Sequence, residues 1–569
     1  MLRALFIALV VAGSGALAPA QVAAESTAAA HHGMVVAQET RAARIGLDIL
    51  RNGGNAVDAA VATGFALAVT YPRAGNLGGG GYMLIHLGGQ DSTKRKVDTA
   101  IDYRETAPAA ITRDIFLDDK GEADPQKSRD SALAIGVPGT VAGLALAHAK
   151  YGSGKFTLAQ LLAPAIALAR GGIPIEDDVA DSLPRAQARL ARWPATAKIF
   201  MHADGRALGP GDTLVQRDLA DTLAAIARKG PRAFYEGAVA DKLVAAVQAA
   251  GGLMKRDDLT SYQPIEHEPV RGSYRGHAIL SMPPSSSGGV ILLEILNILE
   301  AYPDLANDDA RRAHLMVEAM KLAYADRAAF LGDPASVEAP LARLLSKSYA
   351  AELRTRIDPE RARPAADIRP ALPAPREGDN TTHFSVIDRF GNAVSNTYTL
   401  NFSYGLGLVA DGTGVLLNNE LDDFAAKPGA PNAFGLLGGE ANAPGPGKRP
   451  LSSMSPTIVL KDGKPFLVTG SPGGSRIITA VLQVISNVID RKLPITDAVA
   501  EPRLHHQWMP DQVLVEREFS RDTMRALQGR GHTVVDSLQP TSTNSILVTP
   551  EGLVGAADPR SRGALAAGY

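Results

Sequence analysis

The sequence of 569 residues contains no cysteine. This absence excludes disulfide bonds, thiolate metal sites, iron–sulfur clusters and a cysteine nucleophile. Covalent catalysis would therefore use serine, threonine, lysine or a carboxylate. The chain also lacks an excess of charge of one sign, because 58 Lys and Arg side chains nearly balance 60 Asp and Glu side chains. That balance argues against nucleic acid or an anionic membrane surface as the main partner.

Long hydrophobic runs are scarce as well. The run from Ala4 to Ala12 follows Met1-Leu2-Arg3 and precedes small residues. A positive charge, a short apolar stretch and small residues are typical of a secretory signal peptide, which we assign to residues 1–24. A buried N-terminal helix is the alternative interpretation. The run is too short to span a bilayer well. We therefore expect a secreted protein without a membrane span, periplasmic in a Gram-negative source.

What the chain does contain is enough apolar material for a large core. Apolar residues make up 45% of the sequence and charged residues 21%, which is typical of a globular protein. Hydrophobic spacing up to about residue 331 predicts mostly helices with a few strands. The expected elements are helices at 37–52, 55–70, 157–170, 231–250, 288–301 and 309–331, and strands near 82–87, 97–103 and 269–281.

The pattern changes at residues 357–380, which are rich in proline and charge and poor in apolar residues. That composition predicts an exposed linker. Alternating residues after it predict β-structure. The expected elements are hairpins at 382–401, 456–469 and 543–556, and a helix at 475–490. Helices, a linker and then hairpins suggest stacked sheets with helical outer layers.

Asn380-Thr381-Thr382 stands where the linker ends and the first of these hairpins begins. A cut before Thr381 would give a strand that starts with a free α-amine. The hydroxyl of that threonine could attack a carbonyl carbon while its own amine accepts the proton. An α-amine has a pKa of about 7.7–8.0, which suits a general base near neutral pH. Taken alone, the junction favours the simpler interpretation, an ordinary strand threonine.

The hairpin strengthens the case for chemistry at Thr381. If the hairpin is centred on Phe390, Thr381 lies opposite Thr399, within cross-strand reach. Asn401 would share a face with Thr399, because strand side chains repeat every two residues. A bulge at Gly391 would shift this register.

Further along, Ser471-Pro472-Gly473-Gly474-Ser475 precedes a predicted helix. Consecutive N–H groups in such a turn can form an oxyanion hole, although a plain strand-to-helix turn also needs glycine. Acidic residues at 418–423 could hold an ammonium group, and serines at 448–455 could hold a carboxylate. Arg104 offers a planar fork that matches a carboxylate. Each of these also has an ordinary interpretation as a solvated charge or turn former.

Two other signals carry little weight. His505 and His506 are adjacent, so on a strand they point to opposite faces and chelate poorly. The glycine run at 78–81 does not match a nucleotide-binding pattern, and we attribute it to packing against the neighbouring buried helix.

Nine collinear strings resemble the γ-glutamyltransferases, a family of N-terminal nucleophile hydrolases. They are DYRETAP (102–108), YADR (324–327), TTHFSVID (381–388), TYTLN (397–401), LLNNELDDF (416–424), KRPLSSMSPTIV (448–459), TGSPGGSRIIT (469–479), HHQW (505–508) and DPRS (558–561). The resemblance implies an α+β fold, a four-layer αββα sandwich, and self-cleavage between Asn380 and Thr381. Residues 25–380 would form the large subunit and residues 381–569 the small subunit of an intertwined heterodimer.

The resemblance also implies roles for single residues. Thr381 matches the nucleophile, Thr399 the threonine that hydrogen-bonds it, and Gly473 and Gly474 the oxyanion hole. The groups that hold the γ-glutamyl α-carboxylate match Arg104, Ser452 and Ser453. Those around the α-amine match Asn401, Glu420 and Asp423, although the Glu420 position is Gln in some relatives. Residues 428–447 match a lid loop whose gate, commonly Tyr, is Phe434 here. We expect neither a cofactor nor a metal.

The implied activity is cleavage of γ-glutamyl amides, chiefly glutathione, through a γ-glutamyl-Thr381 ester. Water, amino acids or dipeptides would accept the γ-glutamyl group. A β-lactam side-chain acylase acting on glutaryl or cephalosporin substrates is the nearest alternative. Arg104 together with Asp423 favours the glutamyl interpretation, because glutaryl groups lack the amine. An uncleaved, non-catalytic periplasmic binding protein is an alternative of a different class.

Overall fold

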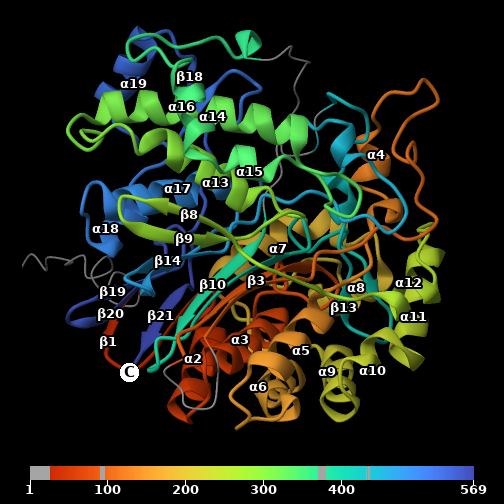
Figure 1. Cartoon of the computed structure of the whole chain (residues 1–569). Coiled ribbons are helices and arrows are strands. Elements are labelled where there is room, and N and C mark those ends of the chain that lie inside the picture. Colours follow the sequence, from red (N-terminus) through yellow and green to blue (C-terminus); the bar gives the residue numbers. More distant parts are fainter. Residues whose placement is uncertain (1–25, 90–95, 369–379, 431, 433–435) are drawn as a thin grey trace, which may run out of the picture.

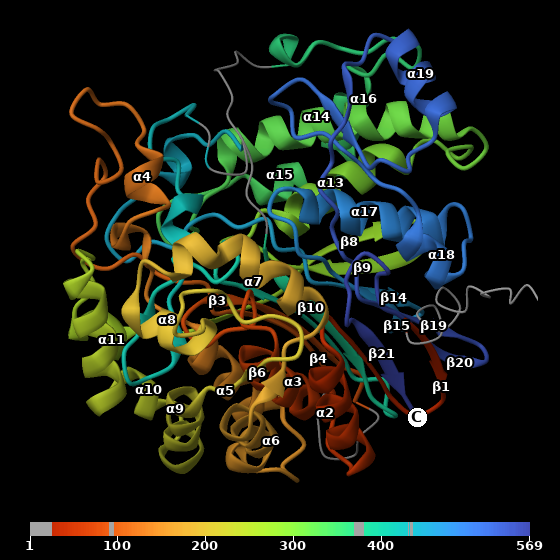
Figure 2. The same cartoon turned by 180° about the vertical axis from the view of Figure 1, so that it is seen from behind.

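The computed structural model describes residues 26–89, 96–368, 380–430, 432 and 436–569, and shows four stacked layers (Figure 1). Two seven-stranded antiparallel sheets pack face to face in the middle. One helical layer covers the outer face of each sheet, and the view from behind shows the same order (Figure 2). The predicted αββα sandwich is therefore confirmed.

The first sheet contains the strand that begins beside Thr381. Its order is β21 (Leu565–Gly568), β2 (Met34–Ala37), β10 (Thr382–Ile387), β11 (Ala393–Thr399), β3 (Gly80–Leu87), β4 (Val97–Asp102) and β7 (Ile265–His267).

The second sheet packs on the first through β14, β15 and β19. Its order is β1 (Thr27–Ala30), β20 (Gly552–Ala556), β19 (Ser545–Thr549), β15 (Lys464–Thr469), β14 (Thr457–Lys461), β9 (His277–Ser281) and β8 (Val270–Tyr274). Both sheets mix strands from before and after the predicted linker, so neither half of the chain contains a complete sheet.

The helical layer on the first sheet is built around α3 (Ala56–Thr70), whose residues are all buried. Its sequence is apolar on every side, which suits a helix enclosed by neighbours. Asn55 and Asp58 form a capping box that starts it. The other helices of this half are α2 (Thr40–Arg51), α5 (Thr140–Tyr151), α6 (Leu158–Gly171), α7 (Asp177–Leu190), α8 (Pro194–Phe200), α9 (Arg217–Lys229), α10 (Arg232–Tyr235), α11 (Gly237–Ala249) and α12 (Arg256–Ser261).

The helical layer on the second sheet surrounds α13 (Gly288–Leu299), which contacts β8 and β9. Its long neighbour α14 (Asp309–Phe330) carries a buried polar and charged face described below. The remaining helices of this layer are α15 (Leu341–Leu344), α16 (Lys347–Arg354), α17 (Arg476–Ile489), α18 (Ile495–Ala500) and α19 (Arg521–Gly529).

Shorter elements connect the layers. The helical ones are α4 (Pro125–Ser128) and the 3₁₀ turns η1 (Ala132–Ala134), η2 (Ala365–Asp367), η3 (Glu420–Asp423) and η4 (Glu440–Asn442). The extended ones are β5 (Ile173–Pro174), β6 (Thr213–Leu214), β12 (Val409–Ala410), β13 (Val415–Leu416), β16 (Leu504–His505), β17 (Val513–Val515) and β18 (Val534–Asp536). No helix among the described residues is long and apolar enough to cross a membrane.

The structure corrects three element predictions. The strand expected at 269–281 is the hairpin β8–β9, because Arg275 and Gly276 both have positive φ, 46° and 78°, and turn the chain. The helix expected at 231–250 is broken between α10 and α11, where Gly237 has a φ of 68°. The first part of the predicted linker, up to residue 368, packs on the fold, since Ala365 is fully buried and accepts a hydrogen bond from Trp508 Nε1 at 3.0 Å.

The reason proposed for the glycine run at 78–81 was also wrong. A Cβ at Gly79 would lie 2.1 Å from the carbonyl oxygen of Thr399, and one at Gly80 would lie 2.5 Å from that of Tyr103. These glycines therefore allow close approach of neighbouring backbone segments, including β11, rather than of the buried helix α3.

Candidate active site

Thr381 lies directly before β10, beside the end of β11. The hairpin pairs Thr382 with Tyr398 and runs without a register shift to Ile387 and Ala393. This is the register predicted for a hairpin centred on Phe390. Accordingly, Thr381 Oγ1 donates a hydrogen bond to Thr399 Oγ1 at 3.4 Å.

The Thr399 hydroxyl organises the surrounding backbone. It donates to the carbonyl oxygen of Asn380 at 2.9 Å and accepts from the amide of Asn401 at 2.8 Å. Asn401 does not continue the strand as predicted, because β11 ends at Thr399 and Asn401 has a φ of 76°. Its side chain donates to the carbonyl of Asn419 at 2.9 Å. Asn401 thus lines the site from a left-handed turn, a conformation that asparagine tolerates.

Asn380 is held on the other side of the junction. Its side chain hydrogen-bonds Arg73 and Ser403. Arg73 is paired in turn with the carboxylate of Asp178, with Nη1–O distances of 2.5 and 2.6 Å. The peptide bond between Asn380 and Thr381 is therefore held from both sides.

The glycine turn before α17 supplies free donors. Gly473 and Gly474 have φ values of 127° and 58°. Within the described residues, neither amide hydrogen has a hydrogen-bond partner. Left-handed glycines at a helix N-terminus form a concave set of N–H groups that suits an anion. Gly474 lines a cavity together with Thr381.

Nearly all of the predicted site residues line that cavity. Its lining contains Thr381, Thr399, Gly474, Arg104, Asn401, Glu420, Asp423, Ser452 and Ser453. Gly473 lines a second cavity, of about 210 Å³, which also contains Thr381 together with Arg73, Asp178 and Arg185. Thr381 thus borders both cavities.

Arg104 is the charged residue that the carboxylates of the first cavity contact. Its side chain is fully buried. The two Nη atoms pair with Glu420 and Asp423, and Nε donates to the carbonyl of Pro450 at 3.1 Å. Burial alone would lower the pKa of Arg104, but the attraction of these carboxylates outweighs it and raises the pKa. Burial likewise raises the pKa of Glu420 to about 7, although Arg104 opposes the shift.

Two buried charged residues of this region were given no role by the sequence analysis. Glu105 has no hydrogen-bond partner for either carboxyl oxygen within the described part of the chain. Burial, followed by the nearby Glu420 charge, raises its pKa well above the usual range. Arg327, near the end of α14, lines the cavity and donates to Ser453 Oγ at 3.3 Å. Both residues lie in strings that carried the resemblance, DYRETAP and YADR, which was the available signal.

The lid prediction falls partly outside the described residues, since Phe434 is not among them. The positions around it can be placed. Asn432 Nδ2 donates to Asp423 Oδ1 at 3.2 Å, and Leu436 lines the cavity beside Thr381. The predicted signal peptide, residues 1–24, also lies outside the described range.

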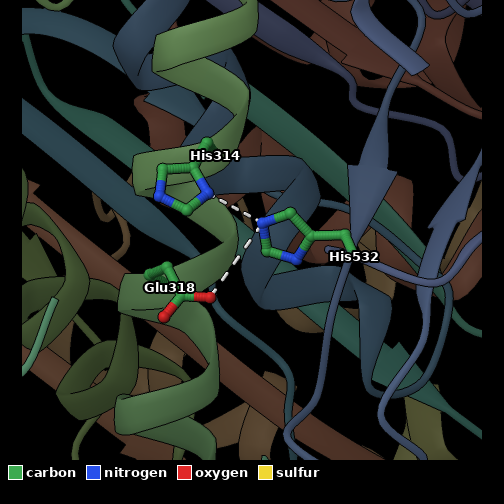
Figure 3. A group of neighbouring side chains, drawn as sticks. All are labelled: His314, Glu318 and His532. Atoms are coloured by element: carbon green, nitrogen blue, oxygen red, sulfur yellow. Dashed lines mark hydrogen bonds and ion pairs between the residues drawn. The ribbon is translucent and has the colours of Figure 1, made fainter. Parts of the chain in front are cut away.

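The two adjacent histidines, His505 and His506, do not line either of these cavities. His505 contacts Thr479 and Gln507, whereas His506 faces Asp511. A separate buried group, which the sequence analysis did not identify, contains His314, Glu318 and His532 (Figure 3).

This group has the residue types of a metal site, but its donor atoms already have partners. His314 Nδ1 and His532 Nε2 are 2.8 Å apart, and His314 Nε2 bonds the carbonyl of Asp358. The Lys321 ammonium donates to Glu318 at 2.9 Å and already supplies a positive charge to that carboxylate. The group therefore links α14, the segment that leads to the predicted linker and the loop after α19 by hydrogen bonds.

Comparison with known proteins identifies the family to which this site belongs. The γ-glutamyltranspeptidase family profile matches residues 42–568. The glutathione hydrolase proenzyme of Escherichia coli K12 is 51% identical over 544 residues, covering 95% of this chain and 92% of the relative.

The chain belongs to the γ-glutamyltranspeptidase family.

Solved structures agree with this family assignment. The cephalosporin acylase of Bacillus halodurans superposes with a TM-score of 0.83 and 29% identity, over 99% of both chains. The Helicobacter pylori γ-glutamyltranspeptidase has a TM-score of 0.56 and 41% identity, over 60% of this chain and 96% of that chain. The first of these shows that the same fold also occurs in a β-lactam acylase, so the γ-glutamyltranspeptidase family fold alone does not select the acyl group.

Proposed function

We propose that this chain is a self-processing γ-glutamyltransferase and glutathione hydrolase with Thr381 as its nucleophile. The arrangement of Thr381, Thr399 and the Asn380 carbonyl carries the proposal. Residues 25–380 would form the large subunit and 381–569 the small subunit of the mature heterodimer. Residues 1–24 would direct export, to the periplasm in a Gram-negative source.

Self-cleavage starts with attack of Thr381 Oγ1 on the carbonyl carbon of Asn380. The hydroxyl proton passes to the peptide nitrogen, which leaves as the neutral α-amine of Thr381, and the acyl group passes to the hydroxyl oxygen as an ester. Water then hydrolyses this ester and leaves a new carboxylate on Asn380. The Thr399 hydroxyl, already bonded to the Asn380 carbonyl oxygen at 2.9 Å, stabilises the charge that develops there.

Turnover uses the amine that cleavage releases. It accepts the proton of the Thr381 hydroxyl as that oxygen attacks the γ-carbonyl carbon of the donor. The amides of Gly473 and Gly474, which have no partner among the described residues, would hold the oxyanion. The leaving amine takes up the proton, and a γ-glutamyl ester remains on Thr381. Water or the amino group of an acceptor then resolves the ester.

Recognition of the donor needs groups of both charges in one cavity. Arg104, Ser452 and Ser453 would bind the α-carboxylate of the γ-glutamyl group. The α-ammonium would lie against Asn401, Glu420 and Asp423, two of which are paired with Arg104. Since these groups line one cavity with Thr381, the γ-carbonyl can reach the nucleophile while both charged ends are held.

Glutathione fits this chemistry as donor, and amino acids or dipeptides fit it as acceptors. The second cavity, which borders Thr381 on the side of Gly473 and Arg73, offers room for the leaving group and for the acceptor. Arg185 on its rim could attract a carboxylate at the far end of a dipeptide.

A β-lactam side-chain acylase is the second candidate, supported by the likeness to the cephalosporin acylase. The two carboxylates of the cavity argue against it. Glu420 is buried and Asp423 is partly buried, and a glutaryl group offers no ammonium to match them.

The test combines maturation with substrate choice. Wild-type protein should give two bands on a denaturing gel, and the smaller band should begin at Thr381. It should hydrolyse γ-glutamyl-p-nitroanilide faster than glutaryl-p-nitroanilide. Thr381→Ala should remain one inactive band. A single active band, or faster turnover of the glutaryl amide, would contradict the proposal.

A further inference from the structure

Asn380 is bound through its side chain as well as through its carbonyl group. Its amide oxygen accepts a hydrogen bond from Arg73 Nη2, and its amide nitrogen donates to Ser403 Oγ. Arg73 Nε also donates to Ser403 Oγ, at 3.2 Å. The three side chains therefore form a closed ring of hydrogen bonds on the N-terminal side of the peptide bond before Thr381.

The three nitrogen atoms of the Arg73 guanidinium group have different partners. Nη1 alone contacts both carboxylate oxygens of Asp178, at 2.5 and 2.6 Å. Nε and Nη2 donate to Ser403 and Asn380. Charge balance with Asp178 therefore accounts for only one of the three nitrogen atoms. Because the guanidinium fork is planar and rigid, the contact with Asp178 also sets the direction of the other two donors.

The Arg73 side chain starts from a backbone segment that is itself fixed. The carbonyl oxygen of Arg73 accepts a hydrogen bond from the amide of Tyr404 at 2.8 Å, directly after Ser403. The Tyr404 hydroxyl lies 2.7 Å from Ser182 Oγ on α7. The Arg73 side chain is only 16% exposed, so little water competes for its contacts. The partners of Asn380 are thus attached to the fold independently of Asn380.

The proposed self-cleavage depends on the geometry of this junction. Thr381 Oγ1 forms a bond to the carbonyl carbon of Asn380, the bond from that carbon to the peptide nitrogen breaks, and the hydroxyl proton passes to the nitrogen. The carbonyl carbon must therefore stay close to the attacking oxygen and in the correct orientation. The hydrogen bond from Thr399 holds the carbonyl oxygen. Contacts to the Asn380 side chain give the same residue a second point of attachment.

We propose that Arg73 is a positioning residue for self-cleavage, which holds the Asn380 side chain together with Ser403. Asp178 orients the Arg73 donors. Among the described residues, the hydrogen bonds of the Arg73 guanidinium reach Asn380, Ser403 and Asp178, so the effect on Thr381 passes through Asn380. This assignment rests on the proposed function, because it concerns the step that would release the α-amine of Thr381.

A double-mutant cycle separates this role from a structural one. The precursor is made by cell-free translation, and its conversion to two bands is followed on denaturing gels. In Arg73→Met the cleavage rate should fall by about 10- to 100-fold, the usual cost of a small misplacement of reacting groups. Asn380→Ala should have a similar effect. The double variant should stay within about threefold of the slower single variant, because each substitution removes the same contact.

Arg275→Met is the matched control. Arg275 also pairs with an aspartate, Asp490, and its side chain is 22% exposed, compared with 16% for Arg73. It lies in the turn between β8 and β9, in the second sheet. Both arginine variants lose an ion pair and should have a lower Tm than the wild type. Only Arg73→Met should slow cleavage.

Two substitutions at Ser403 test the same ring and decide the question if Arg73→Met does not fold. Ser403→Ala removes the hydroxyl that the Arg73 and Asn380 side chains both contact, so cleavage should slow by about 10-fold or more. Ser403→Thr keeps a hydroxyl in that position and should cleave within about threefold of the wild-type rate.

A wild-type cleavage rate in Arg73→Met would overturn the proposal. Effects of Arg73→Met and Asn380→Ala that multiply in the double variant would overturn it too, since the two side chains would then act separately. Equal rates in the two Ser403 variants would have the same meaning. Failure of the proposed function would look different, because the wild-type protein itself would remain a single chain or its smaller fragment would not begin at Thr381.

Discussion

Thr399 Oγ1 donates to the carbonyl oxygen of Asn380 while it accepts the hydroxyl hydrogen of Thr381. One hydroxyl thus contacts both reactants of the proposed self-cleavage, the nucleophilic oxygen and the carbonyl it would attack. Burial of both threonines keeps water from competing for these contacts. Under the proposed function, the pair would serve maturation first and catalysis afterwards.

The first prediction concerns Thr399. Thr399→Ala removes the donor to the Asn380 carbonyl, so self-cleavage should slow by about 10²- to 10³-fold, the usual effect of losing one oxyanion donor. Densitometry of the precursor band over time measures this. Thr382→Val is the control, because the Thr382 hydroxyl has no partner among the described residues. Cleavage of Thr399→Ala at the wild-type rate would show that this contact does not assist the reaction.

A second prediction follows from Glu420, whose pKa burial raises to about 7. Below that pH the carboxyl gains a proton and no longer attracts the α-ammonium. KM for the γ-glutamyl donor should therefore rise as the pH falls from 8 to 6. Glu420→Gln should remove this step and raise KM at pH 8.

Glu440→Gln is the control for this prediction, since Glu440 is an exposed acid in the neighbouring loop, paired with Arg113. It should keep the wild-type profile. A pH-dependent KM that survives in Glu420→Gln would assign the titration to another group.

The third prediction concerns the turn before α17. A Cβ at Gly473 would lie 2.6 Å from Thr541 Cγ2, and its φ of 127° disfavours any side chain. Gly473→Ala should displace the adjacent amide and lower kcat by about 100-fold or more, with a smaller effect on KM. Gly529→Ala is a neutral comparison, because a Cβ there meets nothing within 4 Å. Steady-state kinetics with unchanged kcat in Gly473→Ala would exclude this turn as the oxyanion hole.

The fourth prediction concerns acid stability. Burial lowers the pKa of His505 to about 3, of His506 to about 4 and of His532 to about 2. The unfolded chain takes up these protons below a pH of about 6.5, whereas the folded chain does not. The free energy of unfolding should therefore be unaffected by these histidines above that pH and should decrease as the pH falls below it. Each histidine adds about 1.4 kcal/mol of loss per pH unit.

Urea unfolding of the Thr381→Ala precursor between pH 7.5 and 5 measures this slope. His532→Gln should reduce the slope by about the share of one histidine. His31→Gln, at an exposed position, is the comparison. An unchanged slope in His532→Gln would mean that other groups cause the acid sensitivity.

The residues that depend on local pattern could be predicted from the sequence. The pairing of Thr381 with Thr399 followed from the symmetry of one hairpin, and the buried helix α3 from its apolar composition. Arg275 and Gly276 were harder to place, because a two-residue turn within an apolar run looks like continuous strand. Asn401 lines the cavity beside Thr381, but not as the strand residue that was predicted, since alternation cannot indicate where a strand gives way to a left-handed residue.

Contacts between distant parts of the chain could not be predicted in this way. His314 and His532 are 218 positions apart, and no sequence pattern links them. Arg327 has the spacing of an ordinary helix residue, and only the packing of α14 against the Ser452–Ser453 loop places it at the cavity. The packed segment before residue 368 looked like linker because its anchoring comes from only two buried apolar side chains, Ile357 and Ala365, and from backbone contacts.

The mixing of strands within each sheet has a consequence for how the protein can refold. In the first sheet, β10 and β11 are flanked by β2 and β3, so each fragment of the cleaved chain lacks neighbours that its strands require. The precursor can fold as one molecule, at a rate independent of concentration. After the cut, two denatured fragments must first meet, so refolding becomes bimolecular and fails on dilution. The cleaved protein would therefore stay folded because it unfolds slowly, and not because it refolds reversibly. Its lifetime would be set by the height of the unfolding barrier.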